Sequence, residues 1–500
     1  MKILTLSVIL FVLNFTSALS QTKHDYVWLF GTYEGSRMDF NNKGRIDTVS
    51  KNFMITDNNC QISDKIGKLQ FYFTGCRVVN STDQIMDGGD SINYGKTWQT
   101  YCKGIDLYPG YQSSMIVPDP GNESEGRNGY YLIHKRYELE SIPHLHLSTP
   151  EMYYSYIDMN KNNGKGKVIY KNRPAFRTTN INYGYMTGCK HANGRDWWIL
   201  QSQRLTNKHF SVLLTADTIF CADSMSIGNP LADGEIGQAT FTPDGSKYLI
   251  YNATDDCLIF DFDRSTGILS NYRHVVFQDS AYFTGIAVSP NSRFAYLCAK
   301  WDLFQIDLWA DDIQNSIVHI DHWNGTNPNS YSTSFGFAQL APDCKIYIVP
   351  PGTNRYIHVI NKPDEKGKAC DFRQQSVDLI KTNFNNSIPN YPHFRIDEAQ
   401  ICDSTITWIP DEYIVKSPMV LSVSPNPAAL NTKIYITSDS YEYGKIRIHD
   451  INLNVIRTMD IDSESPVEVD TFGFVSGVYV VEYMSYVSGG RDVEKLVIIE

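Results

Sequence analysis

The most informative segment of the sequence is Thr242-Pro243-Asp244-Gly245-Ser246-Lys247-Tyr248-Leu249-Ile250, because two similar segments follow it. They are Ser289-Pro290-Asn291-Ser292-Arg293-Phe294-Ala295-Tyr296-Leu297 and Ala341-Pro342-Asp343-Cys344-Lys345-Ile346-Tyr347-Ile348-Val349. In each copy, proline fixes φ, and an Asp or Asn beside a small residue favours a tight turn. Alternating apolar residues follow the turn, which is typical of a strand. Each copy therefore predicts a β-hairpin.

Further strands flank each of the three hairpins. An apolar stretch precedes each copy, and a polar gap then leads to another apolar stretch. These later stretches are Cys257–Phe262, Leu303–Leu308 and Tyr356–Ile360. A repeated unit of about 40 to 50 residues with four strands is typical of a β-propeller blade. The repeat therefore favours a propeller over the alternative, which is a β-sandwich of similar strands.

Weaker copies extend this pattern toward the N-terminus. They comprise Met186–His191 with Trp197–Leu200, Ser114–Pro118 with Tyr130–His134, Tyr153–Asp158 and Lys167–Tyr170, and Leu69–Phe73 with Cys76–Asn80. We expect Tyr26–Phe30 to close the ring and Pro389–Ile396 to supply the remaining strand of the last blade. The sequence thus predicts an all-β fold over residues 25–400, a six- to seven-bladed β-propeller with seven blades favoured.

Three stretches carry a resemblance to a known group of proteins. They are Tyr154–Met159, Lys190–Trp198 and Phe260–Gly267. These stretches resemble the lactonase-like or WD-like propellers that are common in secreted Bacteroidetes proteins, and the resemblance covers about residues 25 to 400. It implies a fold but no particular reaction, because propellers serve many functions.

The composition agrees with a folded protein that faces water. Of the 500 residues, 42% are hydrophobic and 13% are aromatic, with 32 Tyr and 24 Phe. Aromatic residues favour strands, and this apolar content excludes a disordered chain. The net charge of −11 argues against a nucleic-acid partner, because nucleic-acid binding needs a cationic face.

The first 20 residues are typical of a secretory signal peptide. Lys2 precedes the apolar stretch Ile3–Leu13, and Ala18-Leu19-Ser20 supplies a cleavage site before Gln21. The apolar core is shorter than the roughly 20 residues that a membrane anchor needs. We therefore expect export of the chain through the periplasm.

Export makes disulfides permissible among the ten cysteines. Cys257 and Cys298 lie in apolar, strand-like runs, which favours buried free thiols. Cys60–Cys76 and Cys344–Cys370 are candidate bridges, although sequence cannot establish the connectivity. The sequence contains no Cys-x-x-Cys pair, so structural zinc of the usual spacing is not expected.

The composition shifts after Cys402. Residues 401–419 are predicted to be a linker, and residues 420–500 contain about seven short strand-like segments. This pattern predicts a small Ig-like β-sandwich.

Residues 420–500 also resemble the type A C-terminal sorting domain of the type IX secretion system. The matching residues are Pro425, Asn426, Pro427, Gly477, Tyr479 and Lys495. Two positions depart from the pattern: Asn454 stands where Gly is frequent, and Glu500 stands where a basic or amide residue is frequent.

The resemblance implies passage through the Sec pathway and then the outer membrane, with the sorting domain usually removed on the way. It also implies that the secretion machinery is a partner of residues 420–500 and that membrane contact is transient. An Ig-like structural or adhesive module is the alternative.

Two segments rich in Asp and Asn invite a calcium-loop interpretation. In Asp158–Gly164 the glycine is one position late, and neighbouring lysines would repel the ion. The same reasoning applies to Asp39–Gly44. Both segments are therefore predicted to be hairpin turns.

Histidines provide the remaining candidates for chemistry. His134 with His144 and His146 is a weak metal candidate, and His191 near Asp196 is better explained as a turn histidine with satisfied hydrogen bonds. The sequence contains no nucleophile elbow, zinc-protease motif or phosphate-binding loop. We assign no catalytic, metal or cofactor-binding residue and expect no cofactor.

These observations favour a secreted or cell-surface protein that acts as a binding or scaffolding module. Its ligand would be a protein or glycan on the propeller face, where loops surround a central channel. The alternative is a propeller hydrolase, a lactonase or a glycan-degrading enzyme, with its active site at the channel. A structural component of a surface assembly is a third class, and it predicts exposed apolar patches.

Overall fold

The computed structural model describes residues 21–499 except 141–145, 179, 233–235, 278–282, 328–330, 353, 382–386, 399–419, 430, 438–443, 451–454, 462–466 and 486–490. The predicted signal peptide and the predicted linker lie outside the described residues. The chain divides into two compact units, Met1–Thr407 and Trp408–Glu500, and each unit is described by itself.

The first unit is built from antiparallel sheets that follow one another along the chain. Two sheets have three strands: β1 (Val27–Phe30), β2 (Glu34–Asp39) and β3 (Arg45–Ser50), then β4 (Cys60–Ser63), β5 (Leu69–Phe73) and β6 (Val78–Asn80). Five sheets have four strands. They are β7 (Ser114–Pro118), β8 (Gly129–Glu140), β9 (His146–Asp158) and β10 (Lys167–Arg177); β11 (Thr187–Lys190), β12 (Trp197–Ser202), β13 (Lys208–Leu214) and β14 (Ile219–Ser226); β15 (Gln238–Phe241), β16 (Lys247–Asn252), β17 (Asp256–Asp263) and β18 (Ile268–Val275); β19 (Thr284–Val288), β20 (Phe294–Ala299), β21 (Asp302–Asp307) and β22 (Val318–His322); and β23 (Ala338–Leu340), β24 (Ile346–Ile348), β25 (Tyr356–Ile360) and β26 (Phe372–Asp378).

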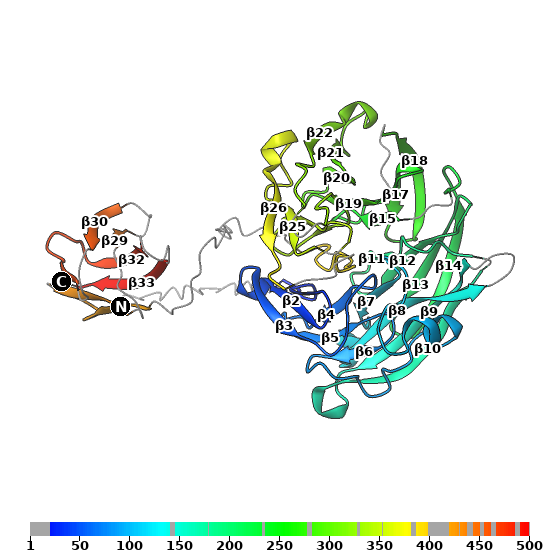
Figure 1. Ribbon diagram of the computed structural model, residues 1–500, viewed down its shortest axis with the longest axis horizontal. Helices are drawn as coiled ribbons and strands as arrows, with labels where there is room; N and C mark the ends of the chain where they lie inside the picture. The colour runs from blue at the N-terminus through cyan, green and yellow to red at the C-terminus, as the bar shows by residue number, and fades with distance from the viewer. Residues whose placement is uncertain are drawn as a thin grey trace, which may run out of the picture. The chain divides into compact units, whose positions relative to one another are not determined.

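The sheets surround a common centre (Figure 1). Strands such as β7, β11, β15 and β19 lie near this centre, whereas β14, β18, β22 and β26 lie at the periphery. Within every four-stranded sheet the strands pair in chain order, from the innermost to the outermost. This arrangement is a β-propeller, as the repeat predicted.

The three repeat copies form hairpins, which confirms the prediction. Phe241 pairs with Tyr248, Val288 with Ala295, and Leu340 with Ile346. The same turn position has a positive φ in all three copies, at 71°, 62° and 62° for Gly245, Ser292 and Cys344. Because only Gly adopts this conformation without a steric cost, the first copy has the least strained turn.

Residues 387–396 form no strand, so the prediction that Pro389–Ile396 completes the last sheet is wrong. Pro389 and Pro392 lack the N–H groups that a ladder needs, and a strand with two such interruptions is disfavoured. The last sheet takes all four strands from β23 to β26 instead. Strand β1 begins the first sheet and pairs with β2, and among the described residues no strand is shared between the two ends of the ring.

Aromatic side chains and hydrogen bonds join the first sheet to the last. The Trp28 ring in β1 lies 5.8 Å from the Tyr347 ring in β24, with their planes at 74°. Ser36 in β2 donates from its hydroxyl to the carbonyl of Leu379, just after β26. Side-chain packing therefore closes the ring without a shared ladder.

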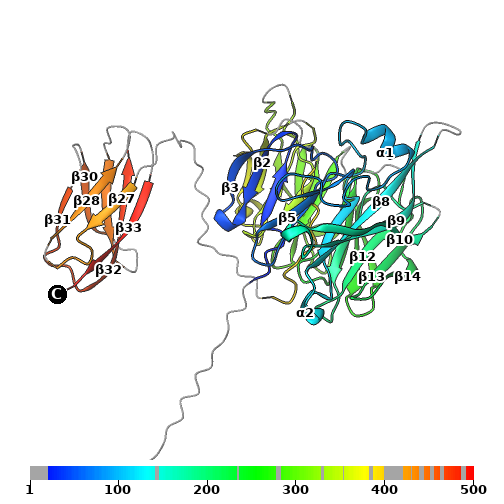
Figure 2. The ribbon, with the colours of Figure 1, turned by 90° about the horizontal axis from the view of Figure 1, so that it is seen from below.

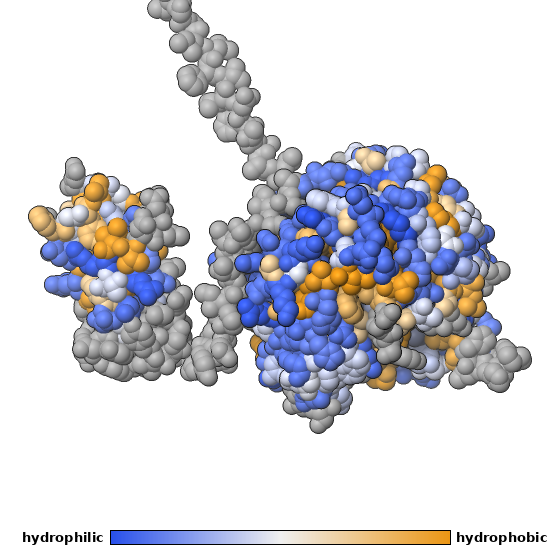
Figure 3. All heavy atoms as spheres, turned by 90° about the horizontal axis from the view of Figure 1, so that it is seen from above, coloured by the Kyte–Doolittle hydropathy of each residue, from blue (hydrophilic) through white to orange (hydrophobic). Residues whose placement is uncertain are grey.

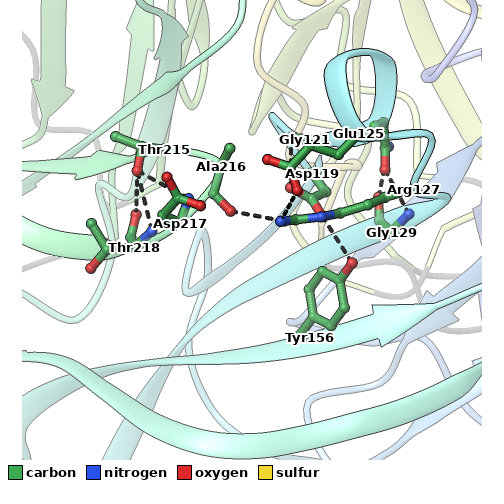
Figure 4. A network of polar contacts seen from close by, with 11 residues as sticks. Asp119, Gly121, Glu125, Arg127, Gly129, Tyr156, Thr215, Ala216, Asp217 and Thr218 are labelled. Carbon is green, nitrogen blue, oxygen red and sulfur yellow. Dashed lines mark hydrogen bonds and ion pairs between the residues drawn. The ribbon is translucent and has the colours of Figure 1, made fainter.

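Two short helices lie on opposite faces of the disc (Figure 2): α1 (Lys96–Tyr101) and α2 (Asn122–Glu125). The α2 loop connects two neighbouring sheets through Arg127, which donates to the Ala216 carbonyl at 2.8 Å and also pairs with Asp119 at 3.4 Å (Figure 4). The Asp119 side chain is completely buried, and it accepts further hydrogen bonds from Tyr156 at 2.9 Å and the Gly121 amide at 2.8 Å.

One disulfide differs from the expected pairs. Cys76 is bonded to Cys102, which lies beside α1, and the S–S distance is 2.03 Å. Cys60 and Cys370 are free, so the candidate bridges Cys60–Cys76 and Cys344–Cys370 are both wrong. The α1 insertion folds back onto the second sheet and brings Cys102 to Cys76, an arrangement that spacing alone cannot show. Cys344 is disulfide-bonded. Cys257 and Cys298 are buried and free, as predicted.

The second unit contains two antiparallel sheets that share one hydrophobic core (Figure 2). One sheet has the order β27 (Val420–Ser424), β28 (Asn431–Thr437), β31 (Val467–Asp470). The other has the order β30 (Val455–Ile461), β29 (Gly444–His449), β32 (Gly477–Ser485), β33 (Arg491–Ile498). Both sheets contribute buried residues to the core, among them Ile434, Val469, Ile446 and Tyr483.

Candidate functional site

The centre of the propeller is filled by the chain's own residues 387–398, which we call the plug. Innermost strands carry main-chain groups that have no neighbouring strand on the channel side, so they need other partners. The plug provides such partners through its side chains. Ile388, Tyr391 and Phe394 of the plug are buried in the same hydrophobic cluster as residues from the surrounding sheets.

Asn390 is the plug residue with the most varied partners. Its side-chain amide donates to the carbonyls of Ser114, at 2.9 Å, and Met186, at 3.0 Å. Its Oδ1 accepts from Gln112 Nε2 at 3.2 Å, and the same Gln112 nitrogen reaches the Ala239 carbonyl at 2.9 Å. The Asn390 side chain thus links β7 to the residue before β11, and through Gln112 it also reaches β15.

Other plug residues contact further sheets. The Tyr391 hydroxyl donates to the Val27 carbonyl in β1 at 3.0 Å, and the main-chain N–H of Asn390 donates to the Asn59 carbonyl, just before β4, at 3.1 Å. His393 Nε2 donates to the Phe241 carbonyl at 3.1 Å, and burial lowers the pKa of His393 to about 4. A neutral imidazole therefore fills this part of the channel at neutral pH.

The end of the plug is held to the N-terminal segment. The Arg395 guanidinium forms a bidentate pair with Asp25, at 2.6 and 2.8 Å. Glu398 accepts from the Thr22 amide at 2.9 Å and from the Thr22 hydroxyl at 2.5 Å. Bidentate pairs of this kind are among the strong hydrogen-bonded contacts in proteins.

A pocket of about 430 Å³ lies where the plug ends. Two repeat turns and a later loop supply one part of its wall, and the end of the plug supplies the other. The lining residues are Pro243, Asp244, Pro290, Asn291, Ser292, Asp364, Arg395, Asp397 and Glu398. The turns that define the fold in the sequence therefore also build this pocket.

The pocket has an excess of negative charge. Asp397 is neutralised by Arg264, whose hydrogen bonds lower the pKa of that carboxyl. Asp364 accepts from the Asn291 amide at 3.0 Å, and burial raises its pKa. Asp244 accepts from the Ser246 amide at 2.9 Å. Among the described residues, no cation forms an ion pair with Asp244, Asp364 or Glu398.

In the second unit, the residues singled out from the sequence come together. The Asn426 side chain donates to the Lys495 carbonyl and accepts from the Val497 amide at 2.8 Å. Gly477 and Tyr479 of β32 pair with Ile498 and Leu496 of β33. The Tyr479 hydroxyl donates to the Val475 carbonyl at 2.8 Å. The segments of Pro425-Asn426-Pro427, Gly477-Val478-Tyr479 and Lys495 thus meet on β33.

The histidine candidates are involved in local structure. His134 is buried between Asn93, at 2.6 Å from Nδ1, and Ser155, at 3.0 Å from Nε2, and burial lowers its pKa to about 3. The described part of the chain does not include His144 or the His146 side chain. His191 accepts from the Asn193 amide at 3.0 Å within its turn, which confirms the turn interpretation.

The two proposed hairpin turns are also confirmed. Asp158 accepts from the Asn160 amide at 2.9 Å between β9 and β10, and Asp39 accepts from the Asn41 amide at 2.9 Å between β2 and β3. Among the described residues, no group of three or more His, Cys, Asp or Glu is placed to hold a metal ion. Every helix in the described part of the chain is too short or too polar to cross a membrane.

Sequence reasoning identified Asp244 and Asn291 as turn residues but missed their role in a pocket. It also missed Asp364, Arg395 and Glu398, because they lie in loops without periodicity and far apart in the chain. In the space-filling view of Figure 3, hydrophilic residues cover much of the visible surface of the first unit, and a band of hydrophobic residues crosses it. The pocket at the end of the plug differs from this hydrophobic band, because charged residues line it.

Comparisons with known proteins add little beyond the fold. No protein-family model and no curated protein sequence matches the chain. Among solved structures, the chain is similar to PorZ, an essential surface component of the type IX secretion system of Porphyromonas gingivalis. The identity is 10%, the match covers 95% of this chain and 74% of PorZ, and the TM-score is 0.33.

The chain is also similar to the Dos1 propeller, with 11% identity, coverage of 66% and 92%, and a TM-score of 0.36. A third similar structure is a gluconolactonase from Xanthomonas campestris, with 11% identity, coverage of 66% and 85%, and a TM-score of 0.29. Similarity at this level carries no argument about function. The propeller assignment rests on the sheets of this chain.

Proposed function

We propose that this protein is an exported, cell-surface or secreted binding protein. Each sheet of the first unit would be one blade of a seven-bladed propeller over residues 25–400, and residues 420–500 would be an Ig-like sorting domain for the type IX secretion system of Bacteroidetes. Residues 1–20 would be the signal peptide and residues 401–419 the linker. The observation that carries the binding role is the acidic pocket at the end of the plug.

The chemistry of the pocket favours a cationic ligand. Asp244, Asp364 and Glu398 bring negative charge to the pocket and form no ion pair with a cation among the described residues, and a cluster of negative charges attracts positive groups. Burial raises the pKa of Asp364 because it disfavours the carboxylate, and a cation bound in the pocket would stabilise that carboxylate. A lysine or arginine side chain of a partner protein fits a pocket of about 430 Å³.

Calorimetry with a short lysine peptide, tetralysine, tests this role. We expect the double variant Asp244→Asn and Asp364→Asn to weaken binding about tenfold or more, because the amides keep the turn hydrogen bonds but lose both charges. The exposed Asp311→Asn variant is the matched control and should bind normally. No binding by the wild type, or equal binding by the double variant, would contradict the proposal.

The same variants address the alternative function. If the wild type hydrolyses a lactone or a glycan and the double variant does not, the hydrolase interpretation replaces the binding role. Activity that is equal in both proteins would place the chemistry elsewhere and leave the pocket to binding.

The export role rests on the meeting of Asn426 with β33. Because the Asn426 amide bonds the backbone at Lys495 and Val497, it fixes the loop before β28 against the last strand. The loop before β32 exposes Phe472 (83%) and Val475 (76%), which suits contact with a protein partner. We propose that Pro425, Asn426, Pro427, Gly477, Tyr479 and Lys495 form the signal that the secretion machinery recognises.

Mass spectrometry of cell fractions from the native host tests the export role. The wild type should appear outside the cell without residues 1–20, and Asn426→Ala should accumulate in the periplasm. Asn431→Ala, at an exposed position of β28, is the control and should be exported. A full-length protein that stays in the cytoplasm with residues 420–500 attached would contradict this role.

A further inference from the structure

The path of the chain after the last sheet is unexpected. Strand β26 is the outermost strand of its sheet, so a chain that continued directly would leave from the rim of the disc. Instead, residues 387–398 return to the centre before the chain continues toward residues 420–500. The link between the two units therefore begins at the hub of the first unit.

The contacts of the plug resemble those of a bound peptide. Four of the side-chain bonds described above go from the plug to main-chain carbonyls in or next to inner strands of four sheets, from Val27 in the first sheet to Phe241 in the fifth. Gln238 completes the hub, because its amide bonds the main chain of Ile286 and Ala338 in the last two sheets. Apolar packing of Tyr391 and Phe394 adds to these bonds. Both kinds of contact are independent of the covalent connection through residues 382–386.

We propose that the central channel is a peptide-binding site whose occupant is the plug of the same chain, and that this site anchors the connection to the second unit. This inference is independent of the ligand proposed for the acidic pocket.

A cleavage experiment on the full-length protein tests the proposal. One protein carries a site-specific protease sequence in place of residues 382–386, and a second carries it in place of residues 403–407. After cleavage under native conditions with a reductant present, so that the disulfide of Cys344 cannot join the fragments, we expect residues 387–500 to co-elute with the propeller from a size-exclusion column. In the second protein, the C-terminal fragment should separate from the propeller.

A plug variant provides the decisive comparison. Asn390→Asp keeps the shape of the side chain but loses both donors to the Ser114 and Met186 carbonyls. We expect the dissociation constant of the cleaved fragment to rise at least about tenfold. Circular dichroism of the uncleaved variant establishes first that the propeller still folds.

Three outcomes would overturn the inference. Release of the wild-type plug fragment as soon as residues 382–386 are cut would show that the channel does not hold it. Retention of the fragment in the second protein would show that another contact holds the two parts together. Unchanged affinity of the folded Asn390→Asp fragment would show that the hub bonds do not contribute.

Discussion

Replacement of Asn390 by alanine should destabilise the propeller more than its single polar side chain suggests. The substitution removes the donors to two buried carbonyls, at 2.9 and 3.0 Å, and the acceptor that faces Gln112 at 3.2 Å. A buried polar group left without a partner costs about 1–3 kcal/mol. With two carbonyls affected, we expect the free energy of unfolding to fall by about 2–5 kcal/mol.

Urea denaturation monitored by tryptophan fluorescence measures this loss. Trp28 is fully buried and its ring lies 6.3 Å from the Tyr391 ring, so unfolding of the hub changes its contribution to the emission of the eight tryptophans. The control is Asn42→Ala, which removes an exposed side chain and should change stability by no more than about 0.5 kcal/mol. If the two variants unfold at the same urea concentration, the plug does not hold the ring together and our reasoning fails.

Three further predictions concern the first unit. Burial lowers the pKa of four histidines from 6.5, so below pH 6.5 the unfolded state binds more protons than the folded state. The free energy of unfolding should therefore fall between pH 6.5 and 4, by up to about 1.4 kcal/mol per pH unit for each histidine. They are His134 and His358, with pKa values of about 3, and His209 and His393, with pKa values of about 4. Urea midpoints at pH 7, 5.5 and 4 check this, and a midpoint that stays constant to pH 4 would contradict it. The double variant Cys76→Ser and Cys102→Ser should lose about 2–4 kcal/mol, and non-reducing peptide mapping should recover the Cys76–Cys102 link rather than a Cys60–Cys76 link. Arg127→Met should lower the free energy of unfolding by about 1–3 kcal/mol in the same urea assay, because Asp119 stays buried without its cation. The control Arg45→Met removes an exposed ion pair and should be nearly neutral, and equal effects of the two variants would refute the role of burial.

The parts of the fold that the sequence predicts are those with local causes. The three Pro-Asp or Pro-Asn turns act within a few residues, so the hairpins at Gly245, Ser292 and Cys344 are visible as a repeat. The strands of the second unit follow from alternation in the same way. These signals need no knowledge of distant residues, but they do not reveal that β1–β3 form a sheet of their own, and they misplace Pro389–Ile396 in the last sheet.

The plug and the pocket depend on distant partners and therefore escape sequence reasoning. Asn390 bonds residues 204 and 276 positions away, and a segment with two prolines in four residues has no period that indicates its place. The Cys76–Cys102 bond has the same explanation, because only the fold of the α1 insertion brings Cys102 near. The charge of the pocket also arises from several separate loops.

The separate origin of the first and last sheets gives the ring a seam. Strands β1–β3 come entirely from the start of the propeller and β23–β26 entirely from its end, and side chains such as Trp28 and Tyr347 meet across the junction. A chain made from its N-terminus can form every sheet and contacts such as Trp28–Tyr347 before it reaches Ser387, but the bonds of Tyr391 to Val27 and of Arg395 to Asp25 are added only afterwards. The seam is therefore reinforced last by the plug, and a chain truncated before Ser387 should hold its first and last sheets together less firmly.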